Sequence, residues 1–259
     1  MKAPEIQLGD GTAIPILYED RSVLAIDKPA GWLVVPTTWQ RTQRNLQTAI
    51  MSSIAARDFW ARSRNLKFLR YVHRLDAETS GVMLFGKTPG AVRSYGDLFE
   101  SRRMEKVYLA VIQGVPRSAE WSCFEPLAEE SSSPKRMKID LRKGKEATTH
   151  FRLLAQSHGR SLVEARPLTG RTHQIRVHLA HTAGPVVGDP LYGETIKGES
   201  LALRSCLLAY GDPFTRRHVV IKAPVDEFLR TYKFTADEII WHGTRTDTSR
   251  PVRGKDFRN

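Results

Sequence analysis

The stretch Phe68–Phe85, FLRYVHRLDAETSGVMLF, places a short polar turn between two apolar, strand-like runs. The run Phe68–Val72 comes before the turn and Val82–Phe85 comes after it, while Asp76 lies in the turn itself. Two such runs joined by small and polar residues that end at Gly81 predict two strands of a sheet. A turn held by a rigid sheet is a frequent location for reactive groups. Asp76 is therefore the first candidate for a functional residue.

The neighbours of Asp76 favour a charged carboxylate. Arg74 is two positions before it, and a nearby guanidinium stabilises the ionised form, which suits a nucleophile better than a proton donor. The alternative is an aspartate that begins a turn, beside an arginine that aids solubility. Local spacing alone favours this plainer interpretation.

The pattern of the whole chain predicts an α+β fold. Strand-like runs outnumber helical ones, which favours a mixed, largely antiparallel central sheet flanked by helices over a doubly wound parallel sheet. The predicted strands are Ser22–Lys28, Leu33–Pro36, Phe68–His73, Val82–Lys87, Lys106–Gln113, Ala147–Ala155, Ser161–Leu168, Leu203–Tyr210 and His218–Ile221. The predicted helices are Asn45–Ala56, Gly90–Arg103, Thr172–Thr182 and Asp226–Tyr232. Thr88 and Pro89 are typical of a helix start, and Gln156–Gly159 is typical of a hairpin turn.

Composition limits the partners. The chain has 259 residues with a net charge of +12 and an isoelectric point near 9.9, so a polyanion such as RNA, DNA or an acidic membrane surface is expected. No apolar run reaches the roughly 18 residues that span a bilayer, so no membrane protein is expected. Cys123 and Cys206 have no metal-binding spacing, and the N-terminus has no secretory segment, which predicts a reducing, cytoplasmic location.

Two basic clusters, Arg41–Arg70 and Pro134–Lys145, have the composition of phosphate-contacting surfaces, with solvated helix faces as the alternative. Trp39 and Trp60 near the first cluster either stack on unpaired bases or are buried. Three histidines crowd one predicted helix, but their spacing matches no metal motif, so we expect no metal site there. They are His173, His178 and His181.

HRLDAETSG resembles the catalytic motif of the RluA-type RNA pseudouridine synthases, in which HRLD is followed by two variable residues and TSG. Four further blocks agree in order and spacing, so the resemblance covers roughly residues 14 to 230 and is highly specific. They are YEDRSVLAIDKPAGWLVVP (Tyr18–Pro36), EKVYLAVIQG (Glu105–Gly114), LTGRTHQIRVHLAHTAGPVVGDPLYG (Leu168–Gly193) and LRSCLLAYGDPF (Leu203–Phe214).

The resemblance implies a role for each matching residue. Asp76 corresponds to the catalytic aspartate that engages the ribose of a target uridine, and Arg74 to the arginine that takes the place of the extruded nucleotide. Tyr108 corresponds to the tyrosine that stacks on the uracil, and Arg171 to the arginine that pairs with the aspartate. From the residues alone, Tyr108 is more typical of a strand core and both arginines of a solvated surface.

The resemblance also implies the fold, the partner and the absence of cofactors. The expected fold is the pseudouridine synthase catalytic fold, with two halves of one sheet around a central cleft. We expect structured RNA, tRNA or ribosomal RNA, as the partner, a monomer, and no metal, nucleotide or redox cofactor. The predicted organisation is an N-terminal arm (1–13), a catalytic domain (14–235) without an S4 domain, and a basic, flexible tail (236–259). Further expected RNA contacts are His73, Thr79, Arg70, Lys106, His173 and Arg176.

Two positions depart from the family pattern. Leu208 stands where the family commonly has a histidine, and Asp27 stands for the asparagine often found before Lys-Pro, in a predicted turn. Neither is a catalytic position. Two other function classes stay open at this point: a non-catalytic RNA-binding protein on the same scaffold, and a glycosidase or base-excision enzyme. The latter needs a second acid to activate water, for which Glu78 is the nearest candidate.

Overall fold

The computed structural model describes residues 3–34, 44–131, 136–194 and 198–235. Its strands are β1 (Glu5–Gln7), β2 (Ala13–Glu19), β3 (Val23–Lys28), β4 (Arg70–Tyr71), β5 (Ser80–Gly86), β6 (Glu105–Gln113), β7 (Glu120–Cys123), β8 (Leu127–Glu130), β9 (Arg136–Ile139), β10 (Thr149–Ser157), β11 (Arg160–Pro167), β12 (Leu203–Gly211) and β13 (His218–Lys222). Its helices are α1 (Leu46–Ala55), α2 (Phe59–Arg62), α3 (Pro89–Glu100), α4 (Gln174–Thr182) and α5 (Asp226–Thr231).

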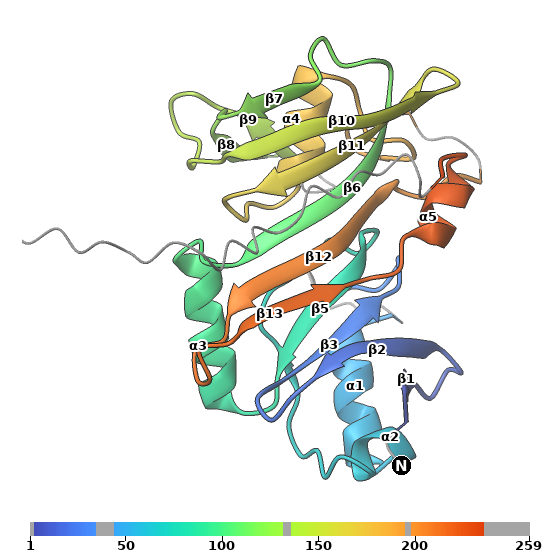
Figure 1. The fold of residues 1–259 in the computed structure, drawn as a ribbon, viewed down its shortest axis with the longest axis vertical. Coiled ribbons are helices and arrows are strands. Elements are labelled where there is room, and N and C mark those ends of the chain that lie inside the picture. Colours follow the sequence, from blue (N-terminus) through green and yellow to red (C-terminus); the bar gives the residue numbers. More distant parts are fainter. Residues whose placement is uncertain (1–2, 35–43, 132–135, 195–197, 236–259) are drawn as a thin grey trace, which may run out of the picture.

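One large sheet forms the centre of the described part of the chain (Figure 1). Its order is β1-β2-β3-β5-β12-β6-β11-β10-β7, with β4 on β5 and β13 on β12, while β8 and β9 form a separate two-stranded sheet. All pairings between the described strands are antiparallel except β5 with β12. The predicted α+β class with a mixed, mostly antiparallel sheet is confirmed.

The parallel β5–β12 pair joins the two halves of the sheet and needs a glycine. Arg204 lies opposite Ser80, and Ser205 opposite Gly81. Gly81 has φ of +113°, and a Cβ there would lie 2.0 Å from the carbonyl oxygen of Ser205. Because only glycine permits this backbone approach, the last residue of the HRLDAETSG motif brings the end of the Asp76 turn against β12.

Helices cover the sheet where the pattern predicted them. The carbonyl oxygen of the Asn45 side chain accepts the Thr48 amide at the start of α1, and Thr88 accepts the Ala91 amide at the start of α3. α3 packs on β4 and β5, and α4 packs on β9, β10 and β11. None of the described helices is long and apolar enough to cross a membrane.

The turn between β10 and β11 has the predicted hairpin geometry. Ser157 pairs with Arg160, and the two residues between them, His158 and Gly159, have φ of +51° and +72°. Positive φ at both central residues matches the right-handed twist of the flanking strands. A histidine stands where asparagine or aspartate is commoner.

Several elements differ from the prediction. β4 spans two residues, not Phe68–His73, and Leu33 forms a single bridge to Asn45 instead of a strand. Five strands were not predicted: β1, β2, β7, β8 and β9. Four of them have only three or four residues, which show little periodicity, and the fifth, β2, is interrupted by Pro15. Within the predicted arm 1–13, β1 pairs with β2 and Ile6 is fully buried. The predicted tail 236–259 lies outside the described residues.

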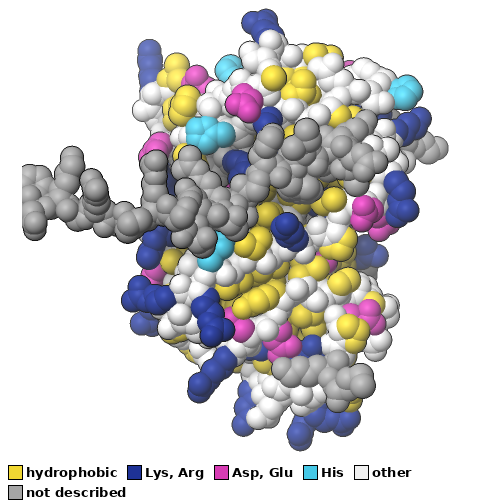
Figure 2. Space-filling model, in the orientation of Figure 1, with side chains coloured by type: hydrophobic (Ala, Val, Ile, Leu, Met, Phe, Trp, Pro, Cys, Tyr) yellow, Lys and Arg dark blue, Asp and Glu magenta, His cyan; other side chains and the backbone are white. Residues whose placement is uncertain are grey.

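Basic side chains are spread over the periphery of the molecule. On the face shown in Figure 2, Lys and Arg gather beside α3 and at the end that holds α1 and α2. The described members of the first basic cluster are mostly exposed, but Arg64 is bound to Glu19 at 2.9 Å and has a nearly buried side chain. Trp60 is buried and donates to Ser53, so it stacks on no base; Trp39 lies outside the described residues.

Candidate active site

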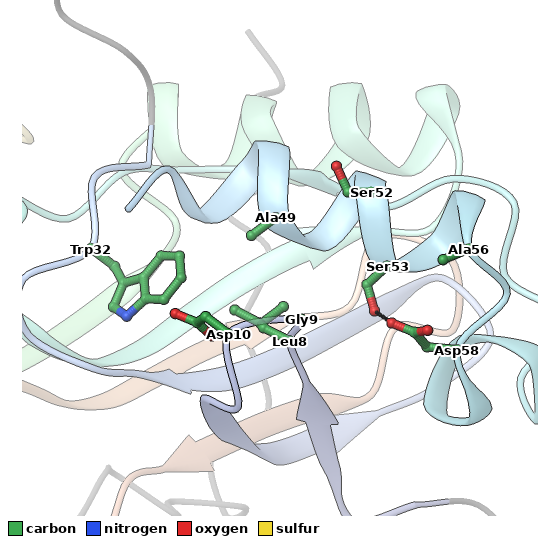
Figure 3. Close-up of a pocket in the computed structure, with 9 residues that line it drawn as sticks. All are labelled: Leu8, Gly9, Asp10, Trp32, Ala49, Ser52, Ser53, Ala56 and Asp58. Carbon is green, nitrogen blue, oxygen red and sulfur yellow. Dashed lines mark hydrogen bonds between the residues drawn. The ribbon is translucent and has the colours of Figure 1, made fainter. Parts of the chain in front are cut away.

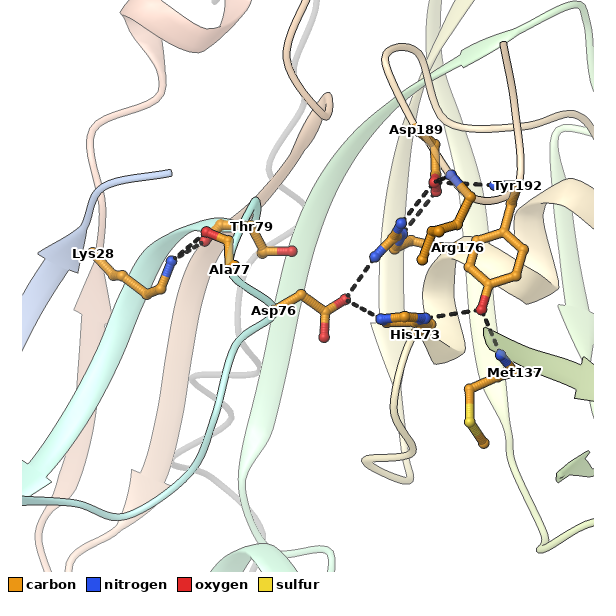
Figure 4. Close-up of polar contacts among 10 residues, drawn as sticks. Lys28, Asp76, Ala77, Thr79, Met137, His173, Arg176, Asp189 and Tyr192 are labelled. Atoms are coloured by element: carbon orange, nitrogen blue, oxygen red, sulfur yellow. Dashed lines mark hydrogen bonds and ion pairs between the residues drawn. The ribbon is translucent and has the colours of Figure 1, made fainter. Parts of the chain in front are cut away.

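Asp76 lies in the turn between β4 and β5, where the two halves of the sheet meet (Figure 4). The amide of Thr79 donates to the carbonyl oxygen of Asp76 at 3.2 Å and closes the turn. The Asp76 side chain keeps 24% of its exposure. The backbone of the turn is therefore fixed, while the Asp76 carboxylate is open to solvent and to a ligand.

A buried lysine binds backbone carbonyls of this turn. Lys28, at the end of β3, is fully buried, and its ammonium donates to the carbonyl oxygens of Pro29, Ala77 and Thr79 at 3.0, 2.9 and 2.9 Å. Burial lowers the pKa of Lys28 to about 8, against the charges of Glu78 and Asp76. At neutral pH the ammonium is charged and ties the end of β3 to the part of the turn that follows Asp76.

Two side chains from the other half of the sheet face the carboxylate of Asp76. Arg176 Nη1 lies 3.3 Å from Asp76 Oδ2, and His173 Nε2 lies 3.9 Å from the same oxygen. His173 precedes the first residue of α4, and Arg176 lies in its first turn. At 3.3 Å, Arg176 and Asp76 form an ion pair with a weak hydrogen bond. Asp76 thus reaches from one half of the sheet to the other (Figure 4).

Arg176 is itself held by a buried acid. Its Nε and Nη2 donate to the two carboxylate oxygens of Asp189 at 2.7 and 2.6 Å, in the two-point geometry that arginine favours. Asp189 is fully buried, and its carboxylate also accepts the amides of Leu191 and Tyr192. Burial opposes the charge of Arg176, but Asp189 and Asp76 raise its pKa. The guanidinium is permanently charged and fixed in direction.

The prediction that Arg171 pairs with Asp76 is wrong. Arg171 is exposed, and its Nε donates to the carbonyl oxygen of Glu146 at 2.9 Å. The Gln174 side chain accepts the Arg171 amide, which fixes the loop before α4 and leaves the Arg171 side chain at the surface. Arg176, five residues later and within α4, faces Asp76 instead. Arg176 stands in the same sequence block but was assigned only an RNA contact.

Tyr108 is central in β6 and is 9% exposed. Burial raises the pKa of the Tyr108 phenol, a hydrogen bond with Ser205 opposes the shift, and the charge of Asp76 adds to it. Tyr108 lies opposite Ser205 of β12, and Ser205 lies opposite Gly81 at the end of the Asp76 turn, so the strand register places Tyr108 near that turn. A phenol with a raised pKa is a poor base, so packing against a base is the role that this position supports.

His73 and Thr79 support the turn and do not extend toward a ligand. His73 Nε2 accepts the Leu84 amide at 3.1 Å, and its ring stacks on Phe99 with centroids 4.5 Å apart. Burial lowers the pKa of His73 to about 3, which keeps the ring neutral. Thr79 is 2% exposed. Both were predicted as RNA contacts, and both are occupied by contacts within the protein.

The remaining predicted RNA contacts divide in the same way. Lys106 donates to the carbonyl oxygen of Thr169 at 2.9 Å, and burial lowers its pKa to about 8. Arg74 and Arg70 are exposed, and the Arg70 guanidinium lies 5.9 Å above the ring of Tyr71. Of this set, the two exposed arginines are available to a phosphate or a base.

The two departures from the family pattern are structural. Asp27 lies in β3, not in a turn, and binds Arg204 Nη2 at 2.6 Å. The same guanidinium donates to Ser80 Oγ and to the carbonyl oxygen of Pro224. Leu208 is 2% exposed in β12 and belongs to the core. The charge of Asp27 is thus matched by an arginine at the junction of the two halves.

The described cavities lie apart from Asp76. The cavity in Figure 3 has a volume of about 380 Å³ between α1 and the β1–β2 turn, and a second of about 360 Å³ lies beside α1 and β4. Neither is lined by Asp76, Tyr108 or Arg176. The predicted histidine group forms no metal site in the described residues, because His178 is buried between Thr149 and the carbonyl of Glu125.

Comparison with known proteins decides the family. Residues 22–181 match the model of the RNA pseudouridylate synthase family. The chain belongs to this family. It is an RNA pseudouridine synthase of the RluA type, an isomerase that acts on RNA. This sets aside the alternatives of a non-catalytic RNA-binding protein and a glycosidase.

Family relatives extend over most of the chain. An uncharacterized RNA pseudouridine synthase of Zymomonas mobilis is 39% identical over 69% of this chain and 78% of its own length. YhcT, an uncharacterized RNA pseudouridine synthase of Bacillus subtilis, is 34% identical over 85% of this chain and 72% of its own. The ribosomal large subunit pseudouridine synthase C of Escherichia coli is 33% identical over 88% and 72%.

Solved structures agree with the fold. Human RNA pseudouridylate synthase domain containing 1 superposes with a TM-score of 0.65 at 26% identity, over 82% of this chain and 83% of that protein. The pseudouridine synthase fold predicted for this chain is therefore confirmed. The supporting residues Lys28, Asp189 and Tyr192 had no predicted role, although all three stand in the sequence blocks that carry the resemblance.

Proposed function

We propose that this synthase isomerises one or more uridines in structured RNA, tRNA or ribosomal RNA, and that Asp76 is its catalytic residue. The observation that carries the proposal is the contact of the partly exposed Asp76 carboxylate with the buried, permanently charged Arg176. The Arg176 guanidinium orients the carboxylate, and an aspartate held in this way is able to act on the ribose of a uridine.

The reaction needs no external reactant. The Asp76 carboxylate engages the ribose, the N1–C1′ bond of the uridine breaks, and the detached uracil turns while it is still bound. C5 then bonds to C1′ and releases its proton to the solvent, and N1, which has lost its bond to C1′, takes up a proton from the surroundings. Both a covalent sugar adduct and a glycal intermediate begin with the same carboxylate, and product and substrate have the same atoms.

Two further residues have proposed roles in binding. Tyr108 packs against the uracil, because its buried phenol is a poor base. Arg74 is exposed two residues before Asp76, where a guanidinium is able to fill the space of an extruded nucleotide. Arg171, also exposed, has no proposed catalytic role.

The decisive experiment is tritium release from RNA labelled at uridine C5. The wild type releases tritium, and Asp76→Asn releases none while RNA binding in a filter assay stays within about twofold, since Asn keeps the shape of the side chain. Glu78→Gln, which changes an exposed acid two residues away, is the matched control and keeps full release. Equal release by Asp76→Asn and wild type refutes the role of Asp76.

The RNA class is a separate question. Relatives named ribosomal large subunit pseudouridine synthases C and D are 33% and 38% identical to this chain, which makes large-subunit ribosomal RNA the first substrate to test. Pseudouridines are mapped in total RNA from cells that lack the protein, with and without wild-type and Asp76→Asn complements. A site lost in the deletion and regained only with the wild type identifies the target.

The proposed setting is the cytoplasm, and the proposed state is a monomer. Cys123 and Cys206 are buried free thiols, which suits a reducing compartment that also holds the RNA. Sedimentation of the purified protein tests the monomer.

A further inference from the structure

A chain of polar contacts continues outward from Asp76 beyond His173 (Figure 4). His173 Nε2 faces Asp76 Oδ2 at 3.9 Å, and His173 Nδ1 lies 2.8 Å from the hydroxyl oxygen of Tyr192. That hydroxyl oxygen accepts the backbone amide of Met137 in β9 at 2.7 Å. This series of side-chain contacts thus links the separate β8–β9 sheet to the turn that carries Asp76.

The contacts of Tyr192 favour one assignment of the protons. Tyr192 already accepts a hydrogen from the Met137 amide, so its own hydrogen is available to His173 Nδ1. Burial lowers the pKa of His173, although Asp76 opposes the shift, so the ring is neutral and carries one proton. If Nδ1 accepts, that proton is on Nε2, which faces the Asp76 carboxylate. The opposite tautomer would turn a lone pair toward the carboxylate.

The backbone of His173 is constrained in a way that supports this role. His173 precedes the first residue of α4 with φ of +53° and ψ of +17°, and its side chain caps no amide of the helix. Left-handed backbone is uncommon for residues other than glycine, but six other described residues share it, so what matters here is the direction that it gives to the ring. The conformation places the ring between Asp76 and Tyr192.

Tyr192 is held independently of His173. The Arg176 guanidinium lies 5.2 Å from the centre of its ring, and the Arg136 guanidinium lies 5.5 Å from it. Its backbone amide donates to Asp189. The hydroxyl that sets the His173 tautomer is therefore fixed by Met137 at one end and by the Asp189–Arg176 pair at the other.

We propose that Tyr192 is a positioning residue for Asp76 and acts through His173, by holding His173 as the Nε2–H tautomer that donates to the Asp76 carboxylate. The inference rests on the proposed catalytic role of Asp76. The present 3.9 Å separation is longer than a hydrogen bond, and an approach of about 1 Å when uridine binds would form one, as catalytic hydrogen bonds often tighten only in the complex.

The first test replaces the Tyr192 hydroxyl alone. Tyr192→Phe is expected to lower kcat about tenfold, equivalent to one lost hydrogen bond, with KM changed by less than about twofold. Tyr232→Phe is the matched control, because it removes a hydroxyl that donates to the Ser200 carbonyl at a buried site elsewhere, and it keeps the wild-type kcat. Equal kcat for Tyr192→Phe and wild type overturns the proposal.

The second test observes the tautomer directly. In protein labelled with ¹⁵N-histidine, long-range ¹H–¹⁵N spectra at neutral pH are expected to show His173 as the Nε2–H form in the wild type and as a mixture in Tyr192→Phe. The His173 signals are assigned by their loss in His173→Gln. A wild-type Nδ1–H form, or an unchanged tautomer in Tyr192→Phe, overturns the proposal whatever the activity.

The third test separates the ring from the backbone. Glycine suits the left-handed conformation, so His173→Gly is expected to fold with an unchanged or higher Tm but to lose kcat about tenfold. His173→Gln, whose amide N–H reaches the position of Nε2, is expected to regain part of it. Full activity of His173→Gly refutes the role of the ring. Failure of the proposed function gives a different result, namely full activity of Asp76→Asn.

Discussion

Arg176 Nη1 contacts Asp76 Oδ2 at 3.3 Å across 100 residues of sequence, while the rest of the same guanidinium binds Asp189. Its Nε and Nη2 donate to the buried acid at 2.7 and 2.6 Å, whereas Nη1 contacts Asp76 at the longer distance of 3.3 Å. Asp189 therefore fixes the guanidinium, whereas Asp76 is held loosely enough to approach a ribose. One arginine orients the carboxylate without immobilising it.

This arrangement predicts different effects for the two arginines of the same block. Arg176→Lys loses the planar fork that binds Asp189 and Asp76 together, so kcat/KM should fall about 100-fold, or about 2.7 kcal/mol in transition-state free energy. Arg171→Lys should change it by less than about twofold, because the Arg171 side chain is exposed and donates to the backbone carbonyl of Glu146, away from Asp76. The kcat/KM of each variant is measured by tritium release from RNA labelled at uridine C5. Equal losses would contradict the assignment of Arg176.

Lys28 should be important for stability. Lys28→Met fills a similar volume but leaves the carbonyl oxygens of Pro29, Ala77 and Thr79 without their common donor. We expect a loss of about 3 kcal/mol in the free energy of unfolding, measured by urea titration, and slower turnover because the Asp76 turn loosens. Lys222→Met, at an exposed position of β13, is the control. An unchanged urea midpoint for Lys28→Met would show that the carbonyls find other donors.

His73 should make stability depend on acid pH. Its pKa is about 3 in the folded protein and about 6.5 in the unfolded chain, so between these values the unfolded chain binds a proton that the folded protein does not. Stability is therefore full above pH 6.5 and falls as the pH decreases, by about 2 kcal/mol at pH 5.

The variant His73→Gln tests this pH dependence. Its side-chain oxygen is able to accept the Leu84 amide in place of Nε2, but it does not titrate. The difference in unfolding free energy between wild type and His73→Gln should therefore change by about 2 kcal/mol between pH 7 and pH 5. His181→Gln, at an exposed position, should show no such change. A constant difference would mean that His73 titrates equally in both states.

Arg74 should matter most when the target nucleotide is stacked. Arg74→Ala is expected to slow turnover about tenfold on folded RNA, where extrusion leaves a space to fill, and to have a smaller effect on an unstructured fragment with the same uridine. Arg70→Ala, at another exposed arginine, should weaken binding to both RNAs similarly through lost phosphate attraction. An equal effect of Arg74→Ala on both substrates would contradict its role in extrusion.

The sequence indicated the elements that have strong periodicity or a definite start. The long strands around β5, β6, β11 and β12 and the helices α1, α3 and α4 lie close to their predicted ranges, because apolar runs and capping residues such as Thr88 act locally. Short edge strands such as β1 and β7 depend on pairing with a neighbour, which the local sequence does not encode.

By itself the sequence determined the family, the class of reaction and the position of Asp76 in a turn between two strands. Only the tertiary structure decided which arginine faces Asp76, because the loop before α4 sends Arg171 outward and the helix turns Arg176 inward against Asp189. It also decided that His73 and Lys106 bind backbone groups of the protein, and that Tyr192 touches His173. Motif spacing orders residues along the chain, whereas side-chain direction and burial depend on the packing of segments far apart in sequence.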